Sequence, residues 1–258
     1  MDNTAKIMPG AEPIYETGGP IGILMLHGFT GTPYEFRELA ERCSGKGYTV
    51  DVPLLDGHGT KSADINRCHW HDWYGTAKKH LFDLRKKCHT VFVIGQSMGG
   101  TLAVHLAAHY QVEGVVLLAP AYRLKHRLSF LAPIVAPFWH LKRKQGGGPD
   151  IQNLKSRKVC VCYPKIPIKG VVQLKNMIAH VADDFQDVHI PVLLAHAVQD
   201  HTIRFKGSKE LYERLSSRDK TFLELNNSFH VLTLDNDKDI VFREIETFIQ
   251  KRVPVEPD

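Results

Sequence analysis

The chain is predicted to be an α/β protein with a mostly parallel central sheet flanked by helices, interrupted by one insertion. Short apolar runs with the composition of buried strands alternate with stretches of helical periodicity, which is typical of βαβ units. This alternation fails between about residues 121 and 188 and then resumes, which indicates a cap or lid over the sheet. A length of 258 residues suits a single domain with such an insertion.

The elements follow in order along the chain. Apolar runs predict strands at residues 21–26, 48–55, 91–95, 115–119, 191–195 and 221–225. Apolar residues at helical spacing predict helices at residues 33–46, 70–87, 98–109, 171–181 and 240–251. In parallel sheets of this kind, ligands bind beyond the carboxyl ends of the strands. We therefore expect the functional residues in the loops that follow the strands.

Composition, charge and cysteine usage argue against several classes of protein. The formal net charge of +5 is modest and no aromatic-basic signature accompanies it, so nucleic acid is not a predicted partner. The N-terminus has no apolar segment of signal-peptide length, and the run at 21–26 is too short to span a membrane, so a cytoplasmic enzyme is expected. Five scattered cysteines make a poor disulfide framework, and Cys160-x-Cys162 lacks zinc-site spacing.

The most informative segment joins the strand at 91–95 to the helix at 98–109. It reads Gly95-Gln96-Ser97-Met98-Gly99, and Gly-x-Ser-x-Gly at a strand-to-helix junction is a nucleophile elbow. The small glycines let strand and helix approach closely, and the tight turn lifts the Ser97 hydroxyl above the sheet. The competing interpretation, a glycine-rich turn with an incidental serine, is disfavoured by the strand before the turn and the helix after it.

A serine hydroxyl needs a base, and the base needs a third group to orient it. With this elbow the expected chain order is serine, acid, histidine. Asp200 follows the strand at 191–195 and is the predicted acid, while His230 follows the strand at 221–225 and is the predicted base. His201 is the main alternative for the base, but it adjoins Asp200 and is therefore badly placed to reach both the acid and the serine. Three further histidines precede Asp200 and break the order: His180, His189 and His196.

The oxyanion of the tetrahedral intermediate needs preorganised N–H donors. The residue after the nucleophile supplies one, here Met98, and the loop after the first strand nominates the N–H of Phe29. Gly28 permits that turn. We expect His27 to brace the loop and His58 to have a packing or hydrogen-bonding role.

Three further segments carry a resemblance to a known family. Residues 27–33 (HGFTGTP), 56–60 (DGHGT) and 228–235 (SFHVLTLD) resemble serine α/β-hydrolases, more narrowly bacterial carboxylesterases and monoacylglycerol lipases. The resemblance runs from about residue 21 to residue 248. It implies the triad Ser97, Asp200 and His230, oxyanion donors at Phe29 and Met98, and hydrolysis of carboxylic esters without a metal or an organic cofactor. Gln96 stands where this subfamily often has leucine or histidine, and the insertion differs from the family pattern more than Gln96 does. The resemblance therefore does not predict the substrate.

The insertion supplies the expectation about substrate. Its apolar stretch is predicted to line an acyl-chain pocket together with Phe29, through Phe130, Leu131, Ile134, Phe138 and Trp139. Basic residues flank this stretch on both sides. A lid that shields the site from water is the first interpretation, and peripheral contact with an anionic lipid surface is the alternative.

The predicted function is therefore hydrolysis of small-molecule or lipid esters. A carboxylesterase for short- to medium-chain esters is the main interpretation, and a monoacylglycerol lipase is the alternative. Thioester and amide hydrolysis use the same triad. A non-catalytic ligand-binding protein is the remote alternative, but it usually lacks a triad member. An epoxide or haloalkane hydrolase would need a carboxylate where Ser97 stands. No feature of the sequence indicates an oligomeric state.

Overall fold

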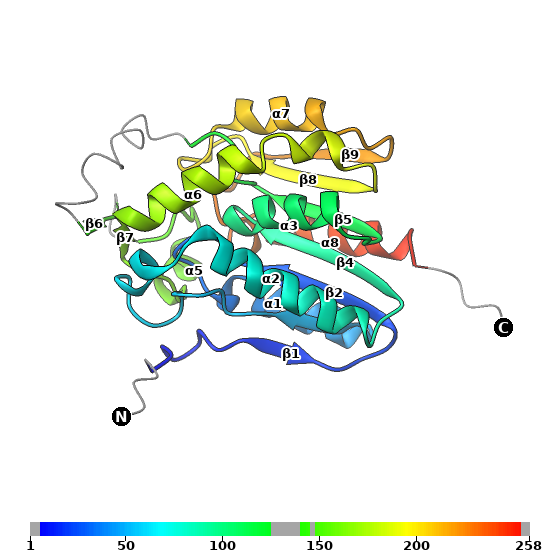
Figure 1. The fold of residues 1–258 in the computed structure, drawn as a ribbon, viewed down its shortest axis with the longest axis horizontal. Helices are drawn as coiled ribbons and strands as arrows, with labels where there is room; N and C mark the ends of the chain where they lie inside the picture. Colours follow the sequence, from blue (N-terminus) through cyan, green and yellow to red (C-terminus); the bar gives the residue numbers. More distant parts are fainter. Residues whose placement is uncertain (1–5, 125–139, 145–147, 254–258) are drawn as a thin grey trace.

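The predicted sheet is present in the computed structural model, which describes residues 6–124, 140–144 and 148–253. Its seven strands lie in the order β1-β3-β2-β4-β5-β8-β9 (Figure 1). The pair β1–β3 is antiparallel and every other pair is parallel. The fold class is therefore confirmed as α/β with a mostly parallel sheet.

The strands of this sheet are β1 (Ile14–Glu16), β2 (Ile21–Leu26), β3 (Thr49–Val52), β4 (Thr90–Gln96), β5 (Gly114–Leu118), β8 (Val192–Ala197) and β9 (Lys220–Leu225). The helices that cover it are α1 (Arg37–Gly45), α2 (Trp70–Arg85), α3 (Met98–His109), α6 (Ile168–His180), α7 (Phe205–Arg214) and α8 (Lys238–Gln250). Short 3-10 turns are η1 (Pro33–Phe36), η2 (Asp64–Arg67), η5 (Asp184–Asp187) and η6 (Leu232–Leu234).

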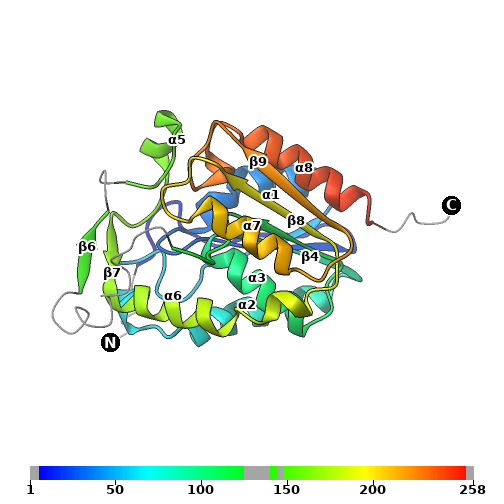
Figure 2. The ribbon, with the colours of Figure 1, turned by 90° about the horizontal axis from the view of Figure 1, so that it is seen from above.

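The helices form one layer on each face of the sheet (Figure 2). Alternate strand residues point to opposite faces. Leu24 and Val93 accordingly pack into the core under α2, α3, α6 and α7, whereas Ile23 and Ile94 pack into the core under α1 and α8. Both faces are covered, which is why the central strands read as continuous apolar runs rather than as alternating patterns.

Each predicted strand and helix has a counterpart, and the differences lie at element ends and in short elements. The helix predicted at 33–46 begins as η1 and continues as α1, and the strand predicted at 48–55 is confined to β3. The short strand β1 and the helix α7 have no strong sequence pattern. The buried positions of α7 are Gly207, Ser208 and Leu211, so small and polar residues obscure its apolar periodicity.

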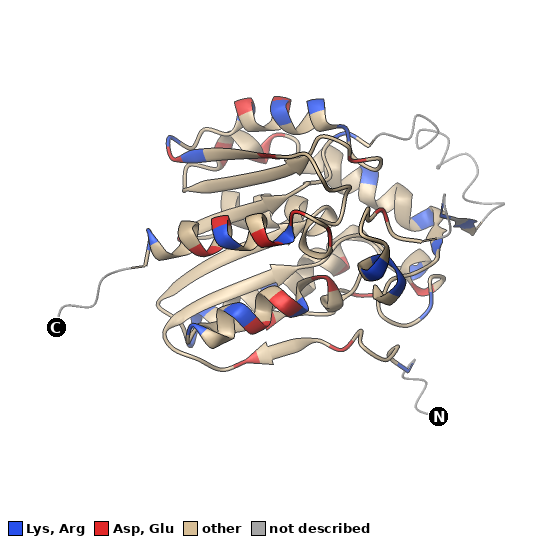
Figure 3. Ribbon diagram, turned by 180° about the vertical axis from the view of Figure 1, so that it is seen from behind, with Lys and Arg blue, Asp and Glu red and all other residues tan. Residues whose placement is uncertain are grey.

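The segment between β5 and β8 leaves the sheet, because these two strands pair directly with each other. Its described part holds the antiparallel strand pair β6 (Leu141–Arg143) and β7 (Lys165–Pro167), the short helix α5 (Leu154–Val159) between them, and then α6 and η5. Residues 140–181 contain nine Lys or Arg and one acid, Asp150. Figure 3 shows this basic character on α5, whereas basic and acidic residues are mixed on α8.

No helix in the described residues combines the length and apolar character needed to cross a bilayer.

Candidate active site

The predicted nucleophile elbow forms a tight turn between β4 and α3. Ser97 lies in this turn with φ 54° and ψ −112°. That conformation lies outside the regions that serine ordinarily adopts, so the surrounding structure must hold it. A Cβ atom on Gly95 would overlap the backbone of Gly99, and one on Gly99 would overlap the carbonyl of Leu26. The two glycines therefore allow the close approach of strand and helix that the elbow requires.

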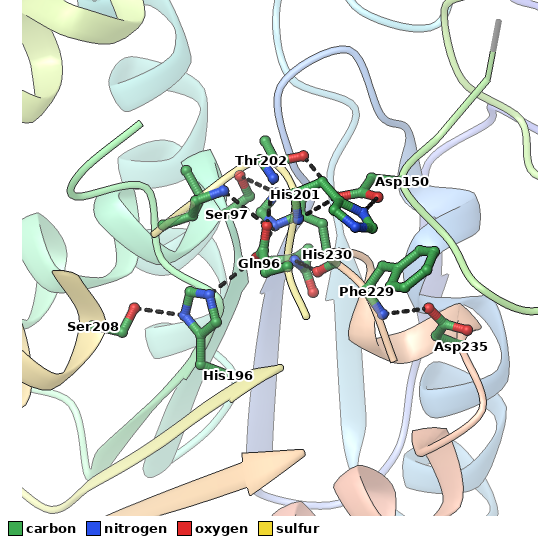
Figure 4. Close-up of polar contacts among 12 residues, drawn as sticks. Gln96, Ser97, Asp150, His196, His201, Thr202, Ser208, Phe229, His230 and Asp235 are labelled. Carbon is green, nitrogen blue, oxygen red and sulfur yellow. Dashed lines mark hydrogen bonds and ion pairs between the residues drawn. The ribbon is translucent and has the colours of Figure 1, made fainter. Parts of the chain in front are cut away.

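Ser97 lies at one end of a hydrogen-bonded chain of three side chains. His230 Nε2 is 2.9 Å from Ser97 Oγ (Figure 4), and His230 Nδ1 is 2.7 Å from Asp200 Oδ2. A carboxylate only accepts hydrogen bonds, so Nδ1 carries the proton and Nε2 is left to accept the proton of the Ser97 hydroxyl. Asp200 follows β8 and His230 follows β9. The structure thus brings together the residues predicted as nucleophile, acid and base.

The Asp200 carboxylate is buried among hydrogen-bond donors. Its Oδ1 accepts from the N–H groups of Thr202 at 2.6 Å and Ile203 at 2.8 Å, and its Oδ2 lies 3.0 Å from His196 Nε2. Burial alone would raise the pKa of Asp200, but His230 and His196 hold that pKa well below its usual range. Burial likewise opposes charge on His230, yet the Asp200 carboxylate raises the pKa of the imidazole above its ordinary value. The surroundings of His230 therefore favour its protonated form.

The loop after β2 passes directly beside the serine. A Cβ atom on Gly28 would lie 3.4 Å from Ser97 Cβ. Met98 is the first residue of α3, where backbone N–H groups have no partner within the helix. Phe29 follows Gly28, and its ring centre is 5.9 Å from that of Trp73. Both residues predicted to donate to an oxyanion thus lie in segments that adjoin Ser97.

Two buried histidines support this loop. His27 Nδ1 donates to the Gly28 carbonyl at 3.0 Å, and its Nε2 accepts from the Leu55 N–H at 3.1 Å. Burial lowers the pKa of His27 to about 4, so the ring is neutral and keeps one tautomer. His58 Nδ1 donates to the Asp56 carbonyl at 3.0 Å, and its ring meets the His27 ring edge-on at 5.0 Å. These contacts match the bracing and packing roles expected of the two residues.

Glu35 is a buried carboxylate beneath the same loop, and no sequence motif marks it. Its Oε2 accepts from the Gly28 N–H at 2.8 Å, and a Cβ atom on Gly31 would overlap the carboxyl group. Burial raises the pKa of Glu35 to about 7. An acid in the first turn of a helix is common, so the sequence does not distinguish this residue from an ordinary helix-start acid.

Two further residues hold the histidine loop, and sequence motifs miss both of these roles. Gln96 Nε2 donates to the His230 carbonyl at 2.9 Å. Asp150 of the insertion accepts from the His230 N–H through its carbonyl at 3.0 Å. Its carboxylate accepts from the His201 N–H at 3.0 Å and the Thr202 hydroxyl at 3.0 Å (Figure 4). His201 Nδ1 also lies 2.9 Å from Asp150 Oδ1, so the competing base pairs with this acid instead of joining the chain to Ser97.

The residues predicted to line an acyl pocket fall into two groups. Outside the described residues lie Phe130, Leu131, Ile134, Phe138 and Trp139. Phe29 is described, and it packs against α6 so closely that a Cβ atom on Gly170 would lie 2.9 Å from its ring. The insertion therefore reaches the loop beside Ser97.

Comparisons with known proteins show which family the chain resembles. The family model described as serine aminopeptidase S33 matches residues 22–237. A thermostable monoacylglycerol lipase from Bacillus sp. (strain H-257) is 34% identical over 251 residues, which cover 96% of this chain and 98% of that protein. A carboxylesterase from Bacillus subtilis (strain 168) is 24% identical over 241 residues, 93% of this chain and 96% of that protein.

A solved structure of a lipolytic enzyme has the same fold as this chain. It belongs to work on LipS and LipT, two metagenome-derived lipolytic enzymes, and matches with a TM-score of 0.91 and 31% identity. The match covers 95% of this chain and 100% of the other chain. The family model spans most of the chain, including the elbow and the loops of Asp200 and His230. The chain therefore belongs to the serine aminopeptidase S33 family and is a serine hydrolase.

Proposed function

We propose that the protein hydrolyses carboxylic esters through Ser97, His230 and Asp200. The observation that carries the proposal is the continuous chain Asp200–His230–Ser97, with contacts of 2.7 and 2.9 Å. His230 takes the proton of the Ser97 hydroxyl as its oxygen attacks the ester carbonyl, and Asp200 stabilises the imidazolium. His230 then protonates the departing alcohol. Water, activated by the same imidazole, hydrolyses the acyl-enzyme.

The N–H groups of Met98 and Phe29 are the proposed donors to the oxyanion. The position of Met98 at the start of α3 supports the first assignment, because positive charge of the helix dipole is concentrated there. The closeness of Gly28 to Ser97 supports the second.

We further propose that the chain is one α/β-hydrolase domain whose insertion, at about residues 121–188, acts as a cap. The direct pairing of β5 with β8 and the packing of α6 on Phe29 support this division. All five cysteines are free thiols, which supports a cytoplasmic location.

The proposed substrates are short- to medium-chain esters, bound by Phe29 and the apolar stretch of the insertion. The similarity to a monoacylglycerol lipase supports lipid esters as the alternative. If lipid esters are the substrates, exposed apolar side chains on α5 favour contact with a lipid surface. Leu154 and Val159 are 68% and 60% exposed there, beside Lys155 and Lys158. Exposed apolar side chains with basic neighbours suit an anionic lipid surface.

A fluorophosphonate probe and a series of substrates test the chemistry. Wild type should be labelled and should hydrolyse p-nitrophenyl esters, whereas Ser97→Ala should do neither. Esters and monoacylglycerols of graded chain length separate the two ester classes. Aminoacyl p-nitroanilides test the amide alternative that the family description raises. Hydrolysis of p-nitrophenyl esters by Ser97→Ala at the wild-type rate would overturn the proposal.

Liposome sedimentation tests the lipid contact. Wild type should bind vesicles that contain an anionic phospholipid, and added salt should weaken this binding. The double variant Leu154→Ser and Val159→Ser should bind less. Ile240→Ser, which removes an exposed apolar side chain from α8, is the matched control and should bind like wild type. Absence of binding at low salt would remove this alternative.

A further inference from the structure

A group of metal-ligating side chains lies away from the active site. We call it the α3–η5 cluster: His105, His109 and Asp184, whose donor atoms all lie within 4.8 Å of one another. His105 and His109 are one turn apart on α3, so their imidazoles share one face of the helix. Asp184 is the first residue of η5. No other such set of three occurs in the part of the chain that the structure describes.

Hydrogen bonds already orient both imidazoles. His109 Nδ1 lies 2.9 Å from the His105 carbonyl, which can only accept, so Nδ1 carries the proton and Nε2 presents a lone pair. His105 Nδ1 lies 2.5 Å from Asp184 Oδ2. For His109 this is the usual arrangement of a metal-binding histidine, with one ring nitrogen fixed by a carbonyl and the other left to bind. In His105 the nitrogen Nδ1 itself faces Asp184 Oδ2, so these two atoms are the ones that an ion would bind, in place of the proton between them.

The surroundings also suit a cation. His109 is the last residue of α3, and the negative end of the helix dipole lies there. The rings of Tyr74 and Trp70 lie 4.5 and 6.0 Å from that of His105, which shields one side of the cluster. A third imidazole, His180 at the end of α6, has its ring centre 5.5 Å from His105.

We propose that His105, His109 and Asp184 bind one divalent transition-metal ion of the zinc type. Imidazole nitrogens and a carboxylate oxygen are the donors that such ions prefer. Around a tetrahedral zinc ion, neighbouring ligand atoms lie about 3.3 Å apart. The donor atoms lie within 4.8 Å of one another, so binding one ion requires their side chains to move closer, and the exposed position of His109 leaves room for this adjustment. His180 or a water molecule completes the coordination.

The ion would have a structural effect rather than take part in hydrolysis. His109 lies twelve residues after Ser97 along α3, or about 18 Å along the helix axis. Asp184 belongs to the end of the insertion, whereas α3 begins at the nucleophile elbow. A metal ion at the cluster therefore ties the end of the insertion to the helix that follows Ser97.

Calorimetric titration of the metal-free full-length protein with ZnCl₂ tests the site. Wild type should bind one ion per chain, and His109→Ala and Asp184→Asn should each weaken binding at least ten-fold. His89→Ala, which removes an exposed histidine outside the cluster, is the matched control and should bind like wild type. His109 is exposed, so its variant should fold even if Asp184→Asn does not.

Two further readouts do not depend on hydrolytic activity. Zn²⁺ should raise the melting temperature of wild type and of Ser97→Ala, but not that of His109→Ala. Co²⁺ should give the visible absorption of a low-coordinate site in wild type but not in His109→Ala. The proposal fails if wild type binds no stoichiometric ion, or if His109→Ala binds Zn²⁺ as tightly as wild type.

Discussion

Two regions of the molecule meet at the active site and contribute in different ways. The loops at the carboxyl ends of β4, β8 and β9 carry Ser97, Asp200 and His230. The insertion carries Asp150, which contacts the acid loop through its carboxylate and the histidine loop through its carbonyl. The proposed reacting groups therefore follow strands of the sheet, while contacts that hold two of their loops come from a segment without any catalytic motif. The following variants separate these two contributions.

The largest effect is expected from the sheet side. Ser97→Ala removes the nucleophile and should lower kcat on esters by about 10⁶-fold. Alanine must adopt the same positive φ as Ser97, and the fold is expected to hold it there because the neighbouring glycines and strands are unchanged. Ester hydrolysis assays and circular dichroism measure the two effects. A loss of activity that accompanied unfolding would contradict this expectation.

Asp200→Asn should have the next largest effect, a loss in kcat of about 10⁴-fold. The neutral amide no longer stabilises the imidazolium or fixes its tautomer. It also removes the charge that raises the pKa of His230. Because the unprotonated imidazole is the active base, the acidic limb of the profile of kcat/KM against pH should move to lower pH. An unmoved limb would show that Asp200 does not control the titration of His230.

Asp150→Ala probes the contribution of the insertion and should lower kcat by on the order of 10²-fold, because small misplacements of catalytic groups have effects of this size. KM should change less than kcat. The control is His201→Ala, which removes one partner of the Asp150 carboxylate but leaves its contact with Thr202. Steady-state kinetics of both variants make the comparison. Equal activities of Asp150→Ala and wild type would mean that the Asp150 carboxylate does not align the acid loop, because the carbonyl contact with the His230 N–H is kept in this variant.

Glu35→Gln should have the smallest effect, and a stabilising one. Burial raises the pKa of Glu35 from 4.5 to about 7, so the folded state disfavours the carboxylate. The stability contributed by protonated Glu35 is fully present below pH 4.5 and is lost as the pH rises to about 7. At pH 8 the glutamine variant should gain on the order of 2 kcal/mol in free energy of unfolding.

Urea unfolding at several pH values checks this expectation. The difference between Glu35→Gln and wild type should grow between pH 5 and 7 and stay constant above that range. Ester hydrolysis should change by less than ten-fold, because the glutamine oxygen can still accept the Gly28 N–H. A constant difference across the whole pH range would contradict the titration of Glu35.

Residue patterns were sufficient for the elements that are long or buried on both faces. β2 and α3 have the predicted bounds, because uninterrupted apolar runs and helical periodicity are strong local signals. α7 lacked such a signal, since Gly207 and Ser208 occupy two of its buried positions. The candidate site divides in the same way. Chain order and position after strands nominated Ser97, Asp200 and His230, which the fold brings within hydrogen-bonding distance.

The sequence by itself determined the elbow, the order of the three proposed reacting groups and the α/β class. Each follows from local pattern and from the rule that parallel strands present their carboxyl ends at one edge. Only the tertiary structure decided which groups support them. Asp150 meets its partners from at least 51 positions away, Glu35 is buried by a loop that precedes it, and His105 meets Asp184 across 79 positions. Such contacts depend on how loops and separate elements pack, and no sequence motif marks them.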